Sequence, residues 1–118
     1  MRKITSESIY AFMNGQDYRK SNMDVESRMN GRVSYMTLHG NLIAMRSDDT
    51  IFISNAGWFS NTTKDRLNGL PGVSINQRNF VWYLNGQEWN GDWINVNTME
   101  PTNWNEMIDK KVSDLYSN

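Results

Sequence analysis

Tight-turn signals divide most of this chain into short apolar runs, and this punctuation constrains the fold more than any other feature of the sequence. Asn30-Gly31 and Asn85-Gly86 are the strongest of these signals, because both central residues of a type I′ hairpin turn require positive φ. His39-Gly40-Asn41 and Ser47-Asp48-Asp49 are further turn candidates. Because short strands joined by such turns pair with their neighbours, the sequence predicts an antiparallel meander of hairpins.

The apolar runs between the turns predict two sets of strands. The first set covers residues 23–28, 33–38, 42–45 and 51–54. The second set covers 73–75, 80–84 and a return strand over 89–96, in which Asn90-Gly91 is expected to form a bulge. The polar segment 16–22 is expected to be a loop, and residues 76–79 a turn.

The first segment of the chain has the pattern of a helix. Thr5 is expected to be its N-cap, with Ile4 and Ile9 packed together as a hydrophobic staple. Phe12 continues the apolar face, and Asn14-Gly15 is expected to end the helix.

Two further helices are predicted after the first set of strands. Thr62 is expected to cap a short central helix, with Asp65 in the capping-box position and Gly69 as a left-handed terminator. Asn103 and Glu106 form the capping pair of a C-terminal helix. The apolar stripe of that helix consists of Trp104, Met107, Ile108, Val112 and Leu115.

This order of elements predicts the α+β fold class. We expect an antiparallel hairpin sheet with an N-terminal helix, a short central helix and a C-terminal helix, all packed on one face of the sheet. A chain of 118 residues has the usual length of one domain, and no repeat or linker divides it. Residues 1–118 are therefore expected to form a single domain.

Composition excludes several kinds of chemistry. The chain has no cysteine, so disulfides, thiolate nucleophiles and sulfur-ligated zinc sites are excluded. Its formal net charge of -1 gives no general attraction for nucleic acid. No apolar run follows Arg2 and Lys3, and no stretch is long enough to cross a bilayer, so we expect neither a signal peptide nor a membrane partner.

Candidate catalytic residues are few. For the single histidine, His39, a turn residue is the favoured interpretation, although Asp48-Asp49 lie near it in the sequence. Glu88 and Asp92 keep open the alternative of a small hydrolase, because Trp89 and its neighbours could hold a sugar beside two carboxylates. No metal site, cofactor site or phosphate-binding loop is identified, and we expect a protein that is not an enzyme.

Aromatic and arginine side chains are the main candidates for a binding surface. Trp82 and Tyr83 are adjacent on one predicted strand and therefore point to opposite faces of the sheet. Exposed rings of this kind stack on nucleic-acid bases or fill the centre of protein interfaces, and the alternative is that most of them fill the core. The candidate binding residues are Trp58, Phe59, Arg66, Arg78, Trp82, Tyr83, Trp89 and Trp93.

Three segments carry a resemblance to a known family: residues 53–69 (ISNAGWFSNTTKDRLNG), 80–86 (FVWYLNG) and 89–91 (WNG). On them the chain resembles a widespread family of small accessory proteins encoded by tailed bacteriophages. The similarity extends from the first helix to about Trp93. It implies a non-structural protein made in the cytoplasm of an infected bacterium, and it transfers no functional residues.

The resemblance favours a function based on binding, since small phage accessory proteins often act by stoichiometric binding. The leading hypothesis is a non-enzymatic protein that binds and inhibits a bacterial host or defence protein. The alternative is a nucleic-acid or nucleotide binding module that uses the sheet aromatics together with Arg66 and Arg78. A homodimer formed through an unpaired edge strand is also left open.

Overall fold

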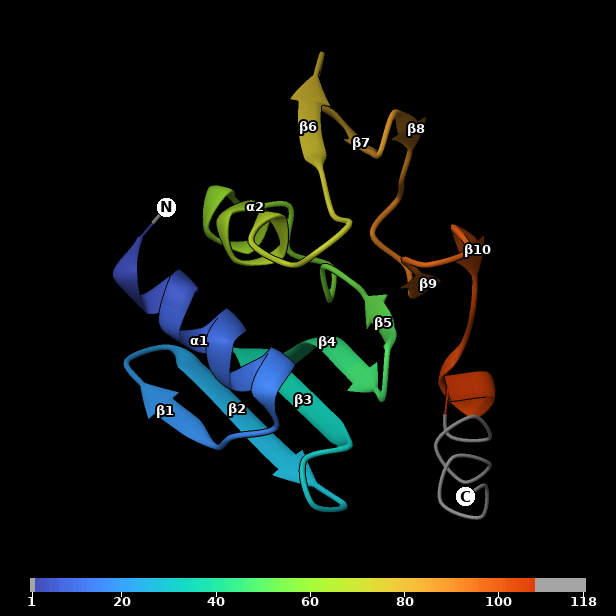
Figure 1. Ribbon diagram of the computed structural model, residues 1–118. Helices are drawn as coiled ribbons and strands as arrows, with labels where there is room; N and C mark the ends of the chain where they lie inside the picture. Colours follow the sequence, from blue (N-terminus) through green and yellow to red (C-terminus); the bar gives the residue numbers. More distant parts are fainter. Residues whose placement is uncertain (1, 108–118) are drawn as a thin grey trace.

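Two antiparallel sheets and two helices form the part of the chain that this computed structural model describes, residues 2–107 (Figure 1). The larger sheet has the strand order β1-β2-β3-β4-β5-β9-β10, and the smaller has the order β6-β7-β8. The larger sheet consists of β1 (Tyr18–Lys20), β2 (Met23–Arg28), β3 (Val33–Leu38), β4 (Asn41–Ser47), β5 (Thr50–Ile53), β9 (Ile94–Asn95) and β10 (Glu100–Pro101). The smaller sheet consists of β6 (Ile75–Arg78), β7 (Val81–Leu84) and β8 (Gln87–Glu88). The helices are α1 (Lys3–Asn14) and α2 (Asn61–Asn68), and residues 104–107 form a further helical turn, which confirms the α+β class.

The first five strands follow one another as a meander, and β2 and β3 occupy the predicted ranges. The predicted loop over 16–22 is wrong, because β1 forms there and pairs with β2. Tyr18 lies opposite Val25 and packs against the core, and the backbone N of Ser27 donates to Asp17 Oδ1 at 2.8 Å. β1 is an edge strand, and charged residues are common in such strands. Its polar sequence therefore resembles that of a loop.

The turns of the meander differ from the predicted ones in length. The loop between β2 and β3 contains four residues, because Arg28 pairs with Val33, so a two-residue turn at Asn30-Gly31 is wrong. His39-Gly40 forms a two-residue turn with φ of 51° and 78°, and Asn41 already belongs to β4. The predicted three-residue turn is therefore one residue too long.

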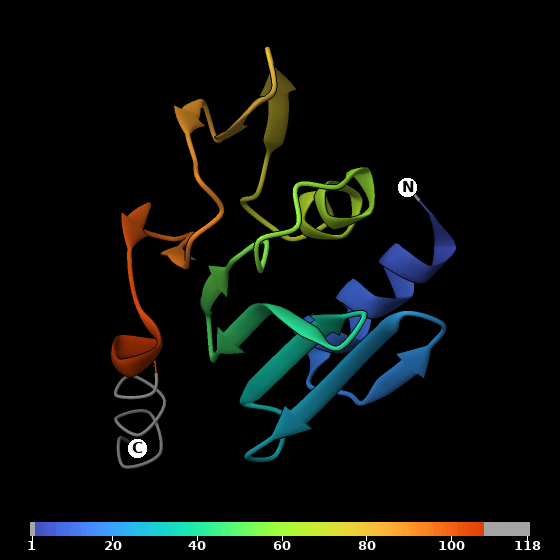
Figure 2. The same cartoon turned by 180° about the vertical axis from the view of Figure 1, so that it is seen from behind.

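Different elements cover the two faces of the larger sheet (Figures 1 and 2). α1 lies across β2 and β3 on one face, where Phe12 and Met36 belong to the main core cluster. Met45 and Phe52 point to the opposite face and form a second cluster with Met107 from the C-terminal turn. The expectation that every helix packs on one face is wrong, because β4 and β5 are apolar on both sides.

α1 begins at Lys3, so Thr5 lies inside the helix and is not its N-cap. The Thr5 hydroxyl is instead buried, where it donates to the Asp65 carboxylate and accepts from Arg66 Nη1 at 2.7 Å. These partners come from α2, far along the chain, which a local capping pattern does not reveal. Gly15 ends α1 in the left-handed region with φ of 66°, as predicted.

α2 begins at Asn61, two residues earlier than a Thr62 cap allows. Ser60 is the N-cap, and its Oγ accepts a hydrogen bond from the backbone N of Thr63 at 3.1 Å. The predicted left-handed terminator is also wrong, because Gly69 has φ of -78° and continues the right-handed path.

The smaller sheet, which we call the arm, projects away from the larger sheet at the top of Figure 1. Its first strand is β6, so the predicted strand over 73–75 and turn over 76–79 are wrong. Arg78 pairs with Val81, which places Asn79-Phe80 in a two-residue turn rather than Phe80 in a strand. The second turn of the arm is Asn85-Gly86, with φ of 50° and 86°, as predicted.

The chain leaves the arm after β8 and returns to the larger sheet. Asn90-Gly91 lies in this connection and does not form the predicted bulge in a return strand. β9 then pairs with β5, with Asn95 opposite Phe52. Of the predicted strand over 89–96, only Ile94–Asn95 is a strand, so the prediction is wrong for the rest of that range.

The helical turn at 104–107 has the predicted cap. Asn103 Oδ1 accepts a hydrogen bond from the backbone N of Glu106 at 3.0 Å. The Glu106 carboxylate accepts from Thr102 Oγ1 at 2.9 Å, which fixes the start of the turn from both sides. The rest of the predicted stripe, Ile108, Val112 and Leu115, lies outside the described residues.

Candidate functional site

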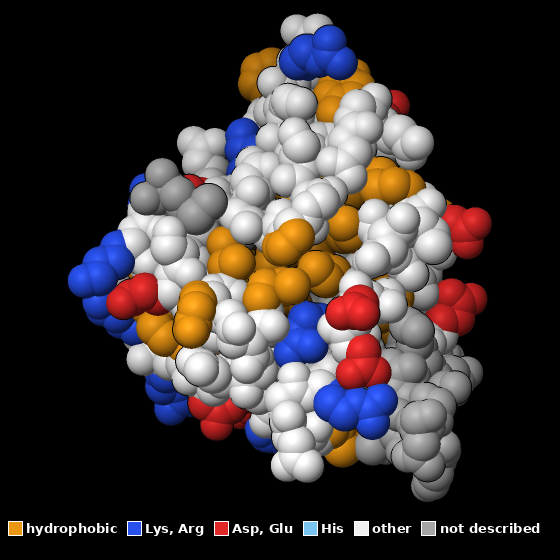
Figure 3. All heavy atoms as spheres, in the orientation of Figure 1, with side chains coloured by type: hydrophobic (Ala, Val, Ile, Leu, Met, Phe, Trp, Pro, Cys, Tyr) orange, Lys and Arg blue, Asp and Glu red, His pale blue; other side chains and the backbone are white. Residues whose placement is uncertain are grey.

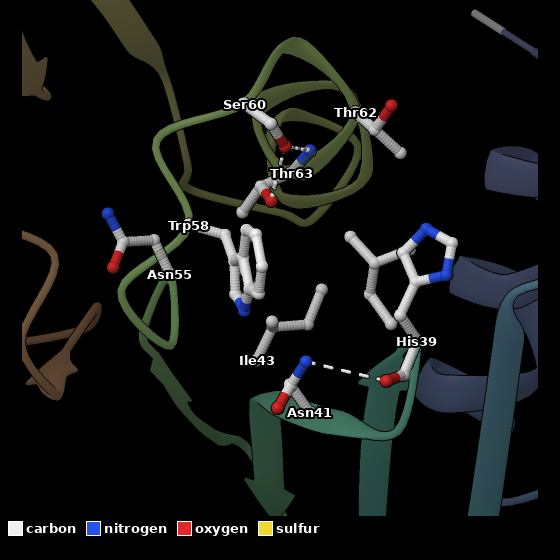
Figure 4. Close-up of a pocket in the computed structure, with 9 residues that line it drawn as sticks. His39, Asn41, Ile43, Asn55, Trp58, Ser60, Thr62 and Thr63 are labelled. Atoms are coloured by element: carbon white, nitrogen blue, oxygen red, sulfur yellow. Dashed lines mark hydrogen bonds between the residues drawn. The ribbon is translucent and has the colours of Figure 1, made fainter.

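A cavity of about 280 Å³ lies between one end of the larger sheet and the start of α2 (Figure 4). Leu38 and Ile43 supply its apolar lining, and the indole ring of Trp58 stands beside Ile43. The remaining lining residues are polar: His39, Asn41, Asn55, Ser60, Thr62 and Thr63. We call this cavity the Trp58 pocket. An apolar interior with a polar rim is the usual chemistry of a binding pocket.

A β-bulge brings Ile43 into the pocket. Met36 pairs with Ala44 and Thr37 pairs with Leu42, so Ile43 is the extra residue on β4. The bulge lets Ile43 and Ala44, which are adjacent in sequence, both join the core cluster on the α1 side of the sheet. The pocket therefore depends on an irregularity that regular alternation does not predict.

A turn over residues 55–58 holds Trp58 away from the core. Asn55 Oδ1 accepts from the backbone N of Gly57 at 2.8 Å, and the backbone N of Trp58 donates to the Asn55 carbonyl oxygen at 2.9 Å. Ala56 and Gly57 both have positive φ, at 54° and 84°, which closes the turn tightly. As a result Trp58 is 60% exposed although its backbone is fixed.

This turn rests on the connection between the arm and β9. The backbone N of Asn55 and the hydroxyl of Ser54 donate to the carbonyl oxygen of Gly91 at 2.9 and 3.0 Å. A Cβ atom on Gly91 would lie 2.2 Å from Asn55 Oδ1, so only glycine fits there. Among the residues that the structure describes, Asn55 Nδ2 is buried and has no hydrogen-bond partner. In Figure 4 the Asn55 amide points away from the Trp58 ring, so this nitrogen does not serve the pocket.

One rim residue, His39, connects the pocket to a buried polar cluster. Its Nε2 lies 3.4 Å from Asn22 Nδ2, and Asn22 Oδ1 in turn accepts from Arg66 Nη2 at 3.5 Å. Arg66 is 2% exposed and donates through Nη1 to Thr5 and to Asp65, the latter at 2.8 Å. Arg66, a candidate binding residue from sequence, is thus a buried brace between α1, α2 and the β1–β2 turn.

The structure separates the candidate rings into buried and exposed ones. Trp82 and Trp89 are buried in the main core cluster, whereas Tyr83 and Trp93 are half-buried. Trp82 thus faces the core and Tyr83 lies on the outer face of the arm. No stacking platform of tryptophans forms on the sheet, because two of the required rings face inward.

Trp58 and Phe59 form an exposed aromatic pair beside the pocket. Phe59 is 56% exposed and meets Trp82 edge to face, with ring centroids 5.1 Å apart and an interplanar angle of 76°. The edge-to-face contact holds the Phe59 ring in place while more than half of the side chain faces solvent. We call this pair the aromatic step.

The hydrolase alternative gains no support from the geometry. Glu88 and Asp92 are both exposed, neither lines the Trp58 pocket, and Asp92 accepts from Asn90 Nδ2 at 3.0 Å. Within residues 2–107 His39 makes no hydrogen bond or ion pair with a carboxylate. No group of three or more histidine, cysteine or acidic residues is placed to hold a metal ion in that range.

Most arginines on the meander are paired with acids. Arg19 contacts Asp24 at 3.0 Å and Arg28 contacts Glu26 at 3.0 Å. Arg32 contacts Asp48 at 2.9 Å. Figure 3 shows the same pattern, with Lys and Arg side chains interspersed with Asp and Glu around a central group of hydrophobic side chains. This face therefore has no continuous basic surface for a phosphate backbone.

Two side chains away from the pocket have displaced pKa values. Burial lowers the pKa of Arg46, and the nearby Asp48 and Asp49 partly oppose this. Its guanidinium donates to the carbonyl oxygens of Phe12 and Gly31 at 2.8 and 2.6 Å and so ties α1 to the β2–β3 loop. Burial, followed by the hydrogen bond to Glu7, raises the pKa of Tyr18.

A family model described as Kyanoviridae Gp96 protein matches residues 1–105. The chain belongs to this phage protein family. The resemblance to small bacteriophage proteins is thereby confirmed, while no curated protein and no solved structure matches the chain. Among the described residues of this Gp96-family chain, no helix has the length and apolarity that a membrane span requires.

Three residues of this Gp96-family protein that shape its surface are not among the candidates from sequence. Asn55 and Gly91 fix the loop of the aromatic step, and Phe80 is 94% exposed at the tip of the arm. The Asn-Ala-Gly pattern signals the turn at Asn55, but nothing local links it to Gly91. The position of Phe80 follows from the pairing register of β6 and β7, which the sequence leaves ambiguous.

Proposed function

We propose that this phage protein acts by stoichiometric binding to a bacterial protein, which it inhibits, and that it performs no catalysis. The observation that carries the proposal is the aromatic step, Trp58 and Phe59, exposed beside an apolar pocket of about 280 Å³. The phage family gives the setting, since such a protein is made inside a bacterium.

The aromatic step has the chemistry of a protein-interface centre. Large rings held on a fixed backbone bury much apolar area on binding with little loss of side-chain freedom, and tryptophan is enriched at interface positions that dominate affinity. The Trp58 pocket beside them can accept one apolar side chain of the partner, whose backbone would meet the polar rim at His39 and Thr62. A protruding aromatic pair next to an apolar pocket favours a folded protein surface as the partner.

Three methionines of the sheet do not extend this surface. Met23, Met36 and Met45 are buried in the core clusters. These three methionines therefore contribute nothing to an interface, and the proposal rests on the aromatic rings.

The nucleic-acid alternative keeps only Tyr83, Trp93 and Arg78 of its candidate residues. Trp82, Trp89 and Arg66 are buried, so they cannot stack on bases or meet phosphates without unfolding the core. Binding to a phosphate backbone also requires several free cations along one surface. Arg19, Arg28 and Arg32 of the meander instead hold carboxylates.

The test compares the wild-type chain with a Trp58→Ala/Phe59→Ala double variant in affinity capture from host-cell lysate. Tyr10→Ala is the matched control, because Tyr10 is also an exposed ring, at 61%, but lies on α1 outside the site. We expect one bacterial protein to be recovered in near-equimolar amount by the wild type and by Tyr10→Ala, and to be lost with the double variant. Titration of its activity should then reach full inhibition near one equivalent.

Two outcomes contradict the proposal in different ways. If the wild-type chain recovers no bacterial protein in stoichiometric amount, the proposed function is wrong. If the double variant recovers the same protein as efficiently as the wild type, the function stands and the aromatic step is not the site.

A further inference from the structure

Among residues 2–107, three two-residue hairpin turns have both central residues at positive φ, and the second central residue is glycine in only two of them. The second central residue is Gly40 in the first and Gly86 in the third, with φ of 78° and 86°. In the turn of the arm it is Phe80, with φ of 67°. Glycine is favoured at this position because a side chain there is strained.

No packing contact of the Phe80 ring with the described chain offsets this strain. Phe80 is 94% exposed, so its ring packs against no part of the described chain. Met99 provides the contrast, because it has φ of 62° but packs against the core cluster. The positive φ of Phe80 and the exposure of its apolar ring each destabilise the free protein. This combination points to a role outside folding.

The neighbours of Phe80 indicate what it meets. Arg78 lies on the outer face of the arm with its guanidinium carbon 4.6 Å from the Tyr83 ring centroid. This contact orients the cation, and Arg78 makes no ion pair with any carboxylate in residues 2–107, unlike Arg19 and Arg28 on the larger sheet. The tip of the arm therefore carries an apolar ring two residues from a positioned cation. Figure 3 shows hydrophobic and Lys or Arg side chains together at its top, where the arm lies.

We propose that the arm is a second contact with the bacterial protein, in which Phe80 enters an apolar pocket and Arg78 meets a carboxylate on the rim of that pocket. This inference rests on the proposed function and names the chemistry of the partner surface: apolar at the centre and acidic at the edge. A protruding ring on a narrow two-residue turn suits a recess better than a flat surface.

A protein pocket explains these observations better than the other occupants. A nucleic acid would require several cations around the ring, whereas Arg78 is the one cation that the described part of the arm carries. A second copy of the chain offers the Trp58 pocket, but the residues that line it include no carboxylate to pair with Arg78.

The test uses two substitutions that separate the ring from the backbone strain. Phe80→Gly removes both, and Phe80→Ala removes the ring while the strain remains. We expect Phe80→Gly to raise the thermal unfolding midpoint by about 3 °C, and Phe80→Ala to leave it nearly unchanged. We expect both to weaken binding to the bacterial protein recovered by the wild-type chain at least about 30-fold in titration calorimetry.

A charge variant and a matched control complete the experiment. Arg78→Glu places a carboxylate against the proposed carboxylate of the partner, so it should weaken the same binding relative to the wild type. The loss should be larger at low salt than at high salt, because salt screens the repulsion. Tyr10→Ala should change neither the midpoint nor the affinity. A loss of binding in a variant that is more stable than the wild type cannot be attributed to unfolding.

Several outcomes overturn the inference. If Phe80→Gly binds the recovered protein as tightly as the wild type does, the arm makes no contact, while the proposed function stands. Self-association of the wild type that Phe80→Gly abolishes would make a second copy the occupant. Quenching of tryptophan fluorescence by single-stranded oligonucleotides that Phe80→Gly abolishes would make it a nucleic acid. If the wild type recovers no protein, the inference falls together with the proposed function.

Discussion

Gly91 lies directly against the side chain of Asn55, and this contact fixes the loop that presents the aromatic step. The Gly91 carbonyl oxygen also accepts the backbone N–H of Asn55 at 2.9 Å. A residue of the return connection thus holds a residue that precedes α2. The proposed binding surface is therefore built by two segments that are distant in sequence.

Gly91→Ala is expected to lower the free energy of unfolding by about 3 kcal/mol, because a left-handed backbone and a steric clash both oppose the new methyl group. Gly86→Ala is the control, since Gly86 has φ of 86° but nothing within 4 Å of its added Cβ. Gly86→Ala should lower the free energy of unfolding by about 1–2 kcal/mol, from backbone strain alone. Urea denaturation measures both, and equal losses would show that the contact with Asn55 has no effect.

The two classes of tryptophan should respond differently to truncation. Trp82→Ala is expected to cost about 4 kcal/mol, because a ring that is 2% exposed leaves a cavity in the core. Trp58→Ala should change stability by no more than about 0.5 kcal/mol, since its ring is mostly solvated. Chemical denaturation of the two variants checks the assignment, and a large loss at Trp58 would place that ring in the core instead.

Arg66→Leu is expected to destabilise the protein by about 2 kcal/mol, since the change leaves Thr5 and the partly exposed Asp65 without their cationic partner. Arg19→Leu is the matched control, because the Arg19 side chain is 83% exposed in its pair with Asp24. Its stability should equal that of the wild type within error. Thermal unfolding at neutral pH separates the two, and similar midpoints would argue against a bracing role for Arg66.

Stability should fall at alkaline pH through Tyr18. Its pKa is raised in the folded state, so the folded protein holds the phenolic proton more tightly than the unfolded chain does. This contribution is complete below the unfolded value of about 10 and is lost as pH rises through the folded value. In Tyr18→Phe the alkaline decline of unfolding free energy should be shallower. Denaturation at a series of pH values compares the slopes, and parallel curves would contradict the assignment.

Sequence patterns predicted the elements that depend on neighbouring residues. β2, β3 and the Asn85-Gly86 turn occur where alternation and turn chemistry place them, and Asn103 caps its helical turn. Gly15 likewise ends α1 because its left-handed backbone is a local requirement. Each of these signals lies within a few residues of its effect.

The misplaced features depend on distant partners. Thr5 has the composition of an N-cap, but Arg66 and Asp65 draw it into a buried cluster. Phe80 continues an apolar run and reads as strand, yet the register of Arg78 with Val81 moves it into a turn. The candidate site shows the same limit, because only tertiary packing decides that Trp58 is exposed and Trp82 is buried.

The arm occupies an interval between two strands that pair with each other, since β5 lies beside β9 in the larger sheet. The chain therefore leaves and re-enters that sheet at adjacent points. Changes in the length or tip of the arm leave the register of the main sheet untouched, as is usual for insertions at such positions. A substitution at the tip of the arm can therefore alter what the arm contacts without altering the sheet that presents it.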